Sequence, residues 1–228
     1  MWYDHDIDQI MKRTQGRPLP QGKISPDMAL GFGVVLAIAS VGVMGLLVNF
    51  MAAIYLGAAI LYYVFVYTMW LKRTTPQNVV IGGAAGAFPP LIGWVAVTGN
   101  ASLEAWILFL IIFLWTPPHS WALALYRNED YQNANVPMLP VVAGKKSTLI
   151  QIWIYTFLLI GSTLLLYREG FMGALYCVSA LILGLGFLIA NLYLSLSKSP
   201  KAPLNVFFYS IFYLFFLFAM MGVDKFTL

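Results

Sequence analysis

Long apolar runs separated by short polar stretches dominate the pattern along the chain. Crossing about 30 Å of hydrocarbon takes roughly 20 residues of helix. Seven runs approach or exceed that length, at about 27–48, 50–71, 78–97, 104–125, 148–167, 171–195 and 205–223. The runs are continuous rather than alternating, and only helices or closed barrels satisfy their backbone in lipid. We therefore predict an all-α fold, a polytopic transmembrane helical bundle that forms one domain over residues 1–228.

The basic residues are distributed unevenly between the two sides that such a bundle creates. When alternate loops are assigned to alternate sides, 11 of the 13 basic residues fall on one side. Only Arg168 and Lys225 fall on the other. The positive-inside rule makes the rich side cytoplasmic, so residues 1–26, 72–77, 126–147 and 196–204 are predicted to be cytoplasmic. The net charge of +4 therefore indicates membrane topology and not nucleic acid binding.

Composition agrees with a membrane protein: 61% of the residues are hydrophobic and 10% are charged, against about a quarter charged in soluble domains. The only cysteine, Cys177, lies in an apolar run, which excludes an intrachain disulfide and predicts a buried thiol. No Lys or Arg lies in the middle of a run, which argues against a charged path through the bilayer.

The chemically rich polar stretches all fall on the predicted cytoplasmic side, in "YDHDIDQIMKRTQGRPLP", "LKRTTPQN", "HSWALALYRNEDY" and "VPMLPVVAGKKST". The opposite loops, such as "VTGNAS" and "YREG", are short and plain. Connections that only joined helices would not be segregated in this way. We therefore expect a functional site at the cytoplasmic surface of the membrane.

Two aspartates near the start of the chain form the first candidate site. Asp4 and Asp8 are four residues apart, so a helix places both carboxylates on one face and turns Asp6 away. Mg²⁺ takes oxygen ligands and often binds one or two carboxylates together with substrate phosphates. Arg13 and Arg17, also four apart, suit phosphate oxygens. The pattern predicts a metal and diphosphate site; the alternative is a solvated stretch with ordinary juxtamembrane arginines.

Prolines accompany the next candidates. His119 follows Pro117 and Pro118 inside the fourth run, where we expect a broken helix and a histidine that either lines a cavity or is a satisfied core residue. Pro89 and Pro90, in a run of small residues, predict a second broken helix with close packing.

Basic and acidic residues in the other cytoplasmic stretches give further candidates. Lys72 and Arg73 end the second run, and Asn78 begins the third. These residues either contact phosphate groups or serve as plain membrane anchors. "YRNEDY" offers a second acidic cluster, and Lys145 and Lys146 either contact phosphates or mark the inner leaflet. The alternative for "YRNEDY" is a hydrophilic loop.

These motifs together resemble the intramembrane aromatic prenyltransferase superfamily, and within it the haem O synthase branch. Asp4, Asp8, Arg13-Thr14 and Arg17 fall at the spacing of the superfamily signature. The branch is indicated by "WYDHDID", "MKRT", "RPLP", "LKRTTPQN", "IGGAAGAFPPLIGW", "TPPHSWALALYRNEDY" and "PMLPVV". These motifs cover most of residues 1–148, and the last three runs match only in hydropathy and length.

The resemblance implies transfer of the farnesyl group of farnesyl diphosphate to a vinyl group of haem B, giving haem O, with Mg²⁺ as cofactor. It implies metal ligands Asp4, Asp8, Glu129 and Asp130, with Asp4, Asp8, His119 and Asp130 taking part in catalysis. It also implies diphosphate contacts from Arg13, Arg17, Lys72, Arg73, Asn78, Arg127 and Lys145. His119 and Tyr126 are the candidates for contact with haem. The implied setting is a bacterial inner membrane, with haem A synthase or cytochrome oxidase assembly factors as partners.

Two departures from the family pattern change the expectations. The signature begins with an Asn that would fall before Met1, and family members have nine spans, so we expect an N-terminal truncation lacking the first two helices. Asn135 stands where the family usually has Gly. Because Asn tolerates left-handed backbone angles, we expect little harm there.

Three other interpretations stay open at this stage. The chain is another superfamily prenyltransferase that acts on a quinone or chlorophyll precursor, or it is an inactive truncated fragment. Alternatively it is a seven-span transporter or receptor without catalysis. Such a protein would be expected to place polar binding groups near the midplane, where this sequence has almost none.

Overall fold

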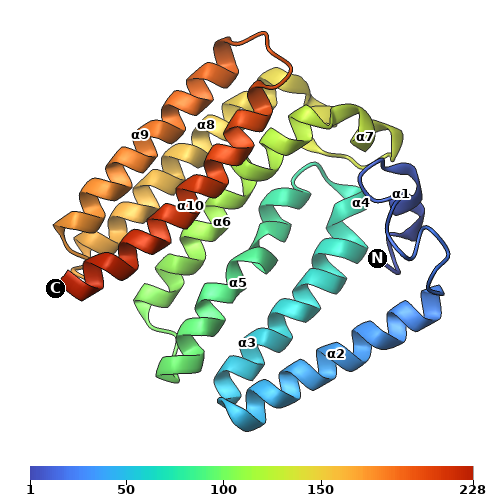
Figure 1. Cartoon of the computed structure of the whole chain (residues 1–228), viewed down its shortest axis with the longest axis horizontal. Helices are drawn as coiled ribbons and strands as arrows, with labels where there is room; N and C mark the ends of the chain where they lie inside the picture. Colours follow the sequence, from blue (N-terminus) through green and yellow to red (C-terminus); the bar gives the residue numbers. More distant parts are fainter. Residues whose placement is uncertain (228) are drawn as a thin grey trace.

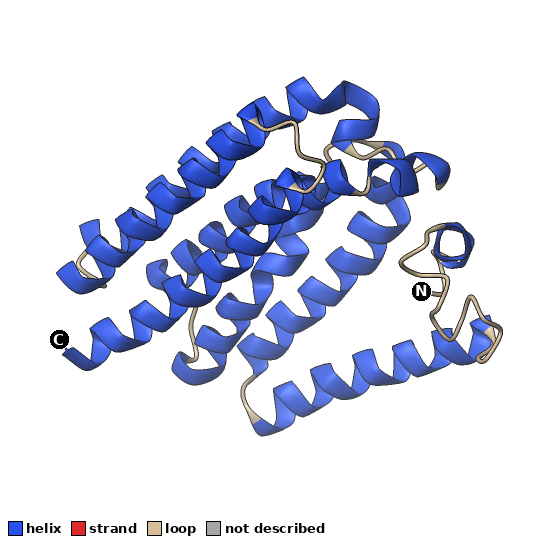
Figure 2. Cartoon of the chain, turned by 45° about the horizontal axis from the view of Figure 1, so that its top comes forward, coloured by secondary structure: helices blue, strands red, loops and turns tan. Residues whose placement is uncertain are grey.

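The computed structural model describes residues 1–227, and these form an α-helical bundle without a strand (Figures 1 and 2). The helices are α1 (His5–Ile10), α2 (Pro26–Leu47), α3 (Phe50–Leu61), the π-helix η1 (Tyr62–Leu71), α4 (Lys72–Thr74), α5 (Asn78–Thr98), α6 (Leu103–Tyr126), α7 (Asn128–Asn133), α8 (Leu139–Arg168), α9 (Ala174–Leu196) and α10 (Ala202–Thr227). Within residues 1–227, seven helical segments are long and apolar enough to span a membrane, as predicted.

Local sequence explains where the long helices begin and end. Ser25 caps α2 by accepting a hydrogen bond from the Met28 N–H, with Pro26 at the first helical position. Asn49 caps α3 through the Ala52 N–H, so α2 and α3 form a tight antiparallel pair. Gly99 ends α5 with a φ of 78°, which glycine adopts without steric cost. Two-residue and few-residue connections therefore return each span to the opposite end of the bundle.

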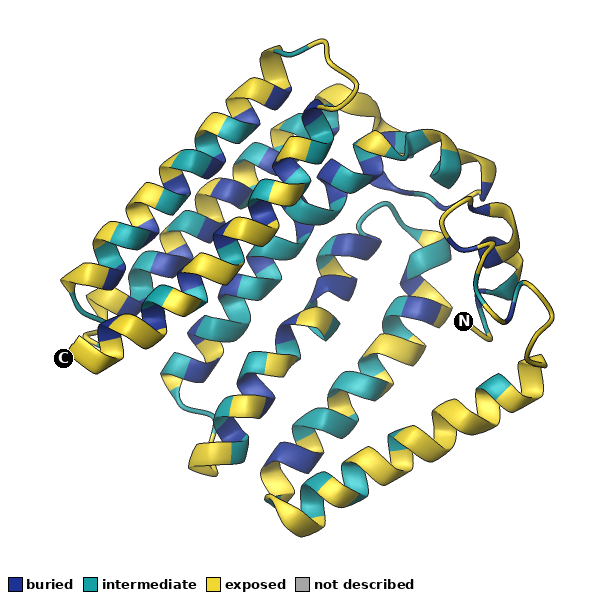
Figure 3. Cartoon of the chain, viewed as in Figure 1, coloured by how far each residue is buried: buried dark blue, intermediate teal, exposed yellow. Residues whose placement is uncertain are grey.

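The core lies where α6 packs against α5, α8 and α10. Trp121 of α6 and Tyr213 of α10 are fully buried there, together with Tyr176 and Phe187 of α9. By contrast, α2 has no buried residue and contacts mainly α3. Figure 3 shows α2 as a mostly exposed helix at one side of the bundle. Its apolar side chains suit a lipid environment.

The predicted breaks at the paired prolines are wrong. Pro89 and Pro90 lie inside an uninterrupted α5, and Pro117 and Pro118 lie inside an uninterrupted α6. Neighbouring helices compensate for missing backbone hydrogen bonds in membrane bundles. The expected close packing is confirmed: a Cβ atom on Gly83 would lie 3.1 Å from Thr116 of α6. The irregular backbone is found elsewhere, at Gly144 in α8 and throughout η1.

All polar connections predicted to be cytoplasmic lie at one end of the bundle (Figure 1). α1, α4 and α7 gather there, together with the loop between α9 and α10. The turns between α2 and α3, α5 and α6, and α8 and α9 lie at the other end. The fold thus brings the candidate residues from distant parts of the sequence to a single end.

Candidate active site

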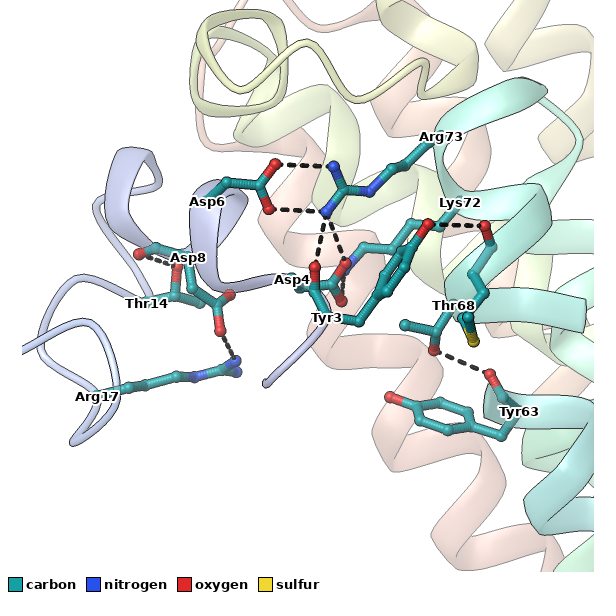
Figure 4. Close-up of polar contacts among 11 residues, drawn as sticks. Tyr3, Asp4, Asp6, Asp8, Thr14, Arg17, Tyr63, Thr68, Lys72 and Arg73 are labelled. Carbon is teal, nitrogen blue, oxygen red and sulfur yellow. Dashed lines mark hydrogen bonds and ion pairs between the residues drawn. The ribbon is translucent and has the colours of Figure 1, made fainter. Parts of the chain in front are cut away.

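The aspartates of α1 divide into buried and exposed members as the helical spacing predicts. Asp4 and Asp8 are buried, with exposures of 7% and 3%, whereas the Asp6 side chain is 62% exposed. Ile7 and Met11 are buried beside them and hold this short helix against the bundle. Burial thus separates Asp4 and Asp8 from Asp6, as the spacing predicts, and Figure 4 shows the carboxylates of Asp4 and Asp8 paired with different basic residues.

Basic residues from elsewhere in the chain pair with these carboxylates (Figure 4). Lys72 Nζ lies 2.5 Å from Asp4 Oδ2, and an Arg73 guanidinium nitrogen lies 3.6 Å from Asp4 Oδ1. Arg73 also donates to both oxygens of Asp6, at 2.8 and 2.7 Å. These contacts join α1 to α4 across more than sixty residues of sequence. Lys72 and Arg73 are thus ion-pair partners of the aspartates at α1, and not only membrane anchors.

Asp8 is held from within the N-terminal segment. Arg17 donates to Asp8 Oδ2 at 3.0 Å, and the buried Thr14 hydroxyl donates to the Asp8 carbonyl at 2.9 Å. The chain after α1 therefore folds back so that the signature arginine faces the signature aspartate. The ion pair between Arg17 and Asp8 is an addition to the predicted role of Arg17 as a phosphate contact.

The electrostatic surroundings of Asp6 favour its charged form. Hydrogen bonding from Arg73 is the main reason that the pKa of Asp6 falls from 3.8 to about 2. Three basic residues, Arg17, Lys72 and Arg73, thus pair with the three aspartates Asp4, Asp6 and Asp8. An additional anion and an additional cation can enter such a site together without a large change in net charge.

The carboxylates also have capacity for a metal. Asp4 Oδ1 is buried and has no hydrogen-bond partner within residues 1–227. Over the same residues, no group of three or more His, Cys, Asp or Glu side chains is close enough to hold a metal ion. A magnesium ion here would therefore use one or two carboxylates and take its remaining oxygens from phosphate and water, as Mg²⁺ commonly does.

The π-helix η1 supplies a feature that sequence reasoning missed. The turns of a π-helix are wider than those of an α-helix. Within η1, the Thr68 hydroxyl donates to the carbonyl of Tyr63, five residues earlier. π-turns are often found at functional sites. Tyr67 of η1 packs directly on Gly82 of α5, where an added Cβ would lie 2.1 Å from the ring. Gly82 therefore makes room for a tyrosine beside the site.

Asn78 is buried with 1% exposure at the start of α5. Its amide nitrogen donates to the carbonyls of Thr75 and Pro137, at 2.8 and 3.4 Å, so it ties two loops together. Its Oδ1 is buried without a partner in the described chain. Because Asn78 Oδ1 is an acceptor, it suits contact with a cation or a hydrogen-bond donor better than contact with a phosphate oxygen.

The second acidic stretch forms a polar cavity of about 450 Å³ with the N-terminal segment. Its lining residues are Lys12, Leu125, Tyr126, Arg127, Asn128, Glu129 and Asp130. Arg127 pairs with Asp130 at 3.5 Å. Burial raises the pKa of Tyr131, and the nearby charges of Arg13 and Arg127 oppose that rise. Lys12 lines this cavity and the charge of Arg13 acts on Tyr131, so the basic residues that follow α1 lie near the second acidic stretch.

Two further predicted residues differ in their surroundings. Lys145 is exposed directly after the kink at Gly144, and no ion pair of residues 1–227 includes it. Asn135 has a φ of 52°, the only positive φ of a non-glycine residue in the described chain. The expectation that Asn135 adopts a left-handed backbone is thus confirmed, because Asn tolerates this region.

His119 lies in the middle of a stack of aromatic rings between α6 and α10. Its ring centroid is 4.1 Å from that of Trp115 and 4.5 Å from that of Phe207. Its Nδ1 lies 2.7 Å from the Ser210 hydroxyl. Sequence reasoning selected the histidine and missed the three residues that hold it, because two of them come from a helix about ninety residues later.

Comparison with known proteins identifies the family of this arrangement. Residues 1–218 match the model of the UbiA prenyltransferase family. The chain belongs to this family. The match covers nearly the whole chain, so the predicted superfamily is confirmed, and with it the assignment to the prenyltransferase enzymes.

Several individual proteins of the family are about 50% identical to this chain. A protein named protoheme IX farnesyltransferase from Parvibaculum lavamentivorans is 53% identical over 99% of this chain and 72% of its own length. A protein of the same name from Rickettsia bellii is 52% identical, over 97% of this chain and 74% of the relative. The chain thus spans about three quarters of the length of these relatives.

Two solved structures share the fold. A digeranylgeranylglyceryl phosphate synthase superposes with a TM-score of 0.81 at 23% identity, over 100% of this chain and 79% of that one. A UbiA homologue from Aeropyrum pernix gives a TM-score of 0.75 at 20% identity, over 98% and 82%. At these identities the likeness establishes the fold, a multi-pass membrane bundle, and no more.

Proposed function

We propose that this chain transfers the farnesyl group of farnesyl diphosphate to a vinyl group of haem B and so forms haem O. The observation that carries this proposal is the identity of 50% or more, over nearly the whole chain, to several relatives named protoheme IX farnesyltransferase. The fold and the paired acidic and basic residues at one end of the bundle support it.

The proposed reaction breaks one bond of the diphosphate and forms two on haem. The C1–O bond of farnesyl diphosphate cleaves, and diphosphate leaves with the electron pair. The terminal vinyl carbon of haem B attacks the allylic cation and forms a carbon–carbon bond. A water molecule adds to the resulting cation next to the porphyrin ring and loses a proton, which leaves a hydroxyl group. Haem B, farnesyl diphosphate and water thus give haem O, diphosphate and a proton.

The residues of α1 and α4 would bind the diphosphate end of the donor. Asp4 and Asp8 would hold Mg²⁺, which neutralises the diphosphate and makes it a better leaving group. Asp4 Oδ1 fits this role because it is a buried acceptor without a hydrogen-bond partner in the described chain. Arg17, Lys72 and Arg73 lie within ion-pair distance of these carboxylates, which supports their proposed role as contacts to phosphate oxygens.

The second acidic stretch would complete the diphosphate site. Glu129 and Asp130 are proposed to hold a second Mg²⁺ in the polar cavity that they line with Lys12. Arg13, Arg127 and Lys145 are proposed phosphate contacts, and Asn78 is proposed to present its Oδ1 to the metal or to a bound water. Asp130 would take part in catalysis through its metal.

The membrane-embedded part of the site would hold the apolar groups. An open apolar groove of about 510 Å³ lies between α5, α6 and α10, lined by residues that include Pro90, Trp115 and Phe218. An apolar surround keeps water from the allylic cation, and aromatic faces stabilise it. His119 is the proposed contact to haem and Tyr126 a second one. We also propose that the site faces the cytoplasm of a bacterial inner membrane, with haem A synthase or oxidase assembly factors as later partners.

Reconstitution of the purified chain in vesicles with haem B, farnesyl diphosphate and Mg²⁺ tests the proposal. We expect haem O, identified by its mass and retention on chromatography, and none in excess chelator. Asp4→Asn and Asp8→Asn should each lower the rate at least 100-fold, whereas Asp27→Asn, an exposed acid of α2, should not. Conversion of a quinone precursor with no conversion of haem B would assign the chain to another branch of the family.

A further inference from the structure

The hydrogen bonds around His119 determine which of its nitrogens carries the proton. The Ser210 hydroxyl donates to the carbonyl of Phe207, at 2.6 Å. A serine hydroxyl has a single proton. Because that proton is directed to Phe207, the contact of 2.7 Å between Ser210 Oγ and His119 Nδ1 requires the histidine to donate. This pattern of contacts assigns the proton of His119 to Nδ1.

The remaining nitrogen of His119 is correspondingly free. In the neutral ring, protonation of Nδ1 leaves the lone pair on Nε2. Nε2 makes no hydrogen bond within residues 1–227, and it is not one of the fully buried polar atoms that lack a partner. It therefore keeps accessible surface and can meet a ligand.

The rest of the ring is held in place by the same two helices. Trp115 and Phe207 stack on its two faces, with interplanar angles of 19° and 27°. The Trp115 Nε1–H donates to the backbone carbonyl of Ser210 at 2.8 Å. Ser210 thus fixes the proton of His119 with its side chain and the stacked indole with its backbone. Of the three stacked rings, Trp115 also lines the apolar groove between α5, α6 and α10.

We propose that Ser210 is a positioning residue that holds His119 as the Nδ1–H tautomer, so that Nε2 is presented as a ligand to the iron of the haem substrate. This inference rests on the proposed function, because it takes haem as the bound group. Histidine ligands of metals usually donate their other N–H to a fixed acceptor, which sets the tautomer and ring orientation. Ser210 supplies this acceptor from α10, and it is fully buried.

The tautomer can be measured on the protein without haem. The chain has two histidines, so ¹⁵N-histidine labelling gives two imidazoles, and His5→Gln leaves only that of His119. We expect ¹⁵N shifts of an Nδ1–H ring in the parent and a shift toward Nε2–H in Ser210→Ala. Ser162→Ala removes a buried serine with the same type of bond to a carbonyl three residues earlier and should change nothing. An Nε2–H ring in the parent, or an unchanged ring in Ser210→Ala, would overturn the inference.

Haem titration followed by absorbance supplies the second measurement. We expect a Soret band typical of histidine ligation that His119→Ala abolishes. Ser210→Ala should weaken haem binding at least 10-fold, in the range seen for partners of metal-bound histidines. Farnesylation of haem with an unchanged Soret band in His119→Ala would overturn this inference and leave the proposed function intact. Histidine-ligated haem that is never farnesylated would instead overturn the proposed function.

Discussion

Asp4 illustrates how much a single residue depends on its surroundings at this site. The Asp4 side chain is only 10% exposed, yet it contacts both Lys72 and Arg73, so its charge is compensated before any ligand binds. Removing one partner of a buried pair leaves the other uncompensated, which costs about 3–5 kcal/mol. Loss of activity in an Asp4 variant therefore has two sources, the missing ligand and the isolated lysine.

A double-mutant cycle separates these sources. Asp4→Asn and Lys72→Gln should each lower the free energy of unfolding, and the double variant should lose less than the sum, with a coupling energy of about 1–3 kcal/mol. Unfolding of the detergent-solubilised chain followed by tryptophan fluorescence measures the three values. Strict additivity would show that the 2.5 Å contact between Asp4 and Lys72 contributes nothing to stability.

Some residues of the candidate site could be predicted from the sequence, and others could not. The pairing of Asp4 and Asp8 on one face followed from their spacing, and Arg17 followed from the motif. The partners of His119 could not be predicted, because Ser210 and Phe207 occupy ordinary positions in an apolar run. Their role depends on which face of α10 meets α6, and several faces of a uniformly apolar helix look alike in sequence.

At the scale of elements, α1 is attached to the bundle by titratable contacts. Its exposed link is the Asp6 pair with Arg73, which lowers the pKa of Asp6 from 3.8 to about 2. A carboxylate whose pKa is lower in the folded state stabilises that state above its unfolded pKa and loses the contribution as pH falls through the folded value. This pair should therefore be fully effective above about pH 4 and lost between about pH 4 and pH 2. Because the side chain is mostly exposed, the effect should not exceed about 1 kcal/mol.

Hydrogen exchange of the α1 amides tests this dependence. After correction for intrinsic rates, protection in residues 5–10 should fall between pH 4 and pH 2 in the parent. Asp6→Asn should have lower protection at pH 6 and a weaker pH dependence, and the difference between the two chains isolates Asp6 from Asp4 and Asp8. Identical protection in both chains at every pH would mean that the Arg73 contact does not hold α1.

The opposite end of the bundle contains a cap that joins two helices. Asp224 of α10 is 1% exposed and accepts hydrogen bonds from the Gly173 and Tyr176 N–H groups, at 2.5 and 3.0 Å. These donors belong to the first turn of α9, where a negative charge also interacts favourably with the helix dipole. The last apolar run was predicted to end just before Asp224, and hydropathy could not reveal that this residue caps α9.

Removal of this cap should destabilise the packing of α9 on α10. We expect Asp224→Ala to lower the free energy of unfolding by about 2–4 kcal/mol, since two hydrogen bonds to a charged acceptor are lost. Asp224→Asn, which keeps one acceptor, should lose less. Glu169→Gln provides the control at the same end, because its pair with Arg168 is exposed and long, at 3.9 Å. Thermal unfolding in detergent gives the comparison, and equal midpoints for Asp224→Ala and Glu169→Gln would exclude the cap.

Span positions were predictable because a continuous apolar run of about 20 residues has few alternatives in lipid. The helix type within a span was not. The paired prolines suggested breaks that α5 and α6 do not have, while η1 has no glycine or proline to indicate a π-helix. Such irregularities depend on contacts with neighbouring helices, such as Tyr67 against Gly82.

For the whole molecule, the two ends of the bundle have different chemistry. The end with α1, α4 and α7 carries the ion pairs of Asp4, Asp6 and Asp8 and the polar cavity beside Glu129. The other end carries short turns and the Asp224 cap. Substrates with a charged head and an apolar tail fit this asymmetry, because the head would bind at the polar end while the tail would lie among the helices.

Orientation in the membrane is the property that connects this asymmetry to the cell, and single cysteines can measure it. In a Cys177→Ala background the chain has no other thiol. Asn100→Cys lies between α5 and α6, and Ser199→Cys lies between α9 and α10, at opposite ends of the bundle.

Because the positive-inside rule places 11 of 13 basic residues on the cytoplasmic side, a membrane-impermeant maleimide added to intact bacterial spheroplasts should label Asn100→Cys. Ser199→Cys should react only after the membrane is opened. The reverse labelling would place Asp4 and Asp8 outside the cell, away from cytoplasmic supplies of a prenyl diphosphate, and the proposed active site would then have the wrong orientation for its substrate.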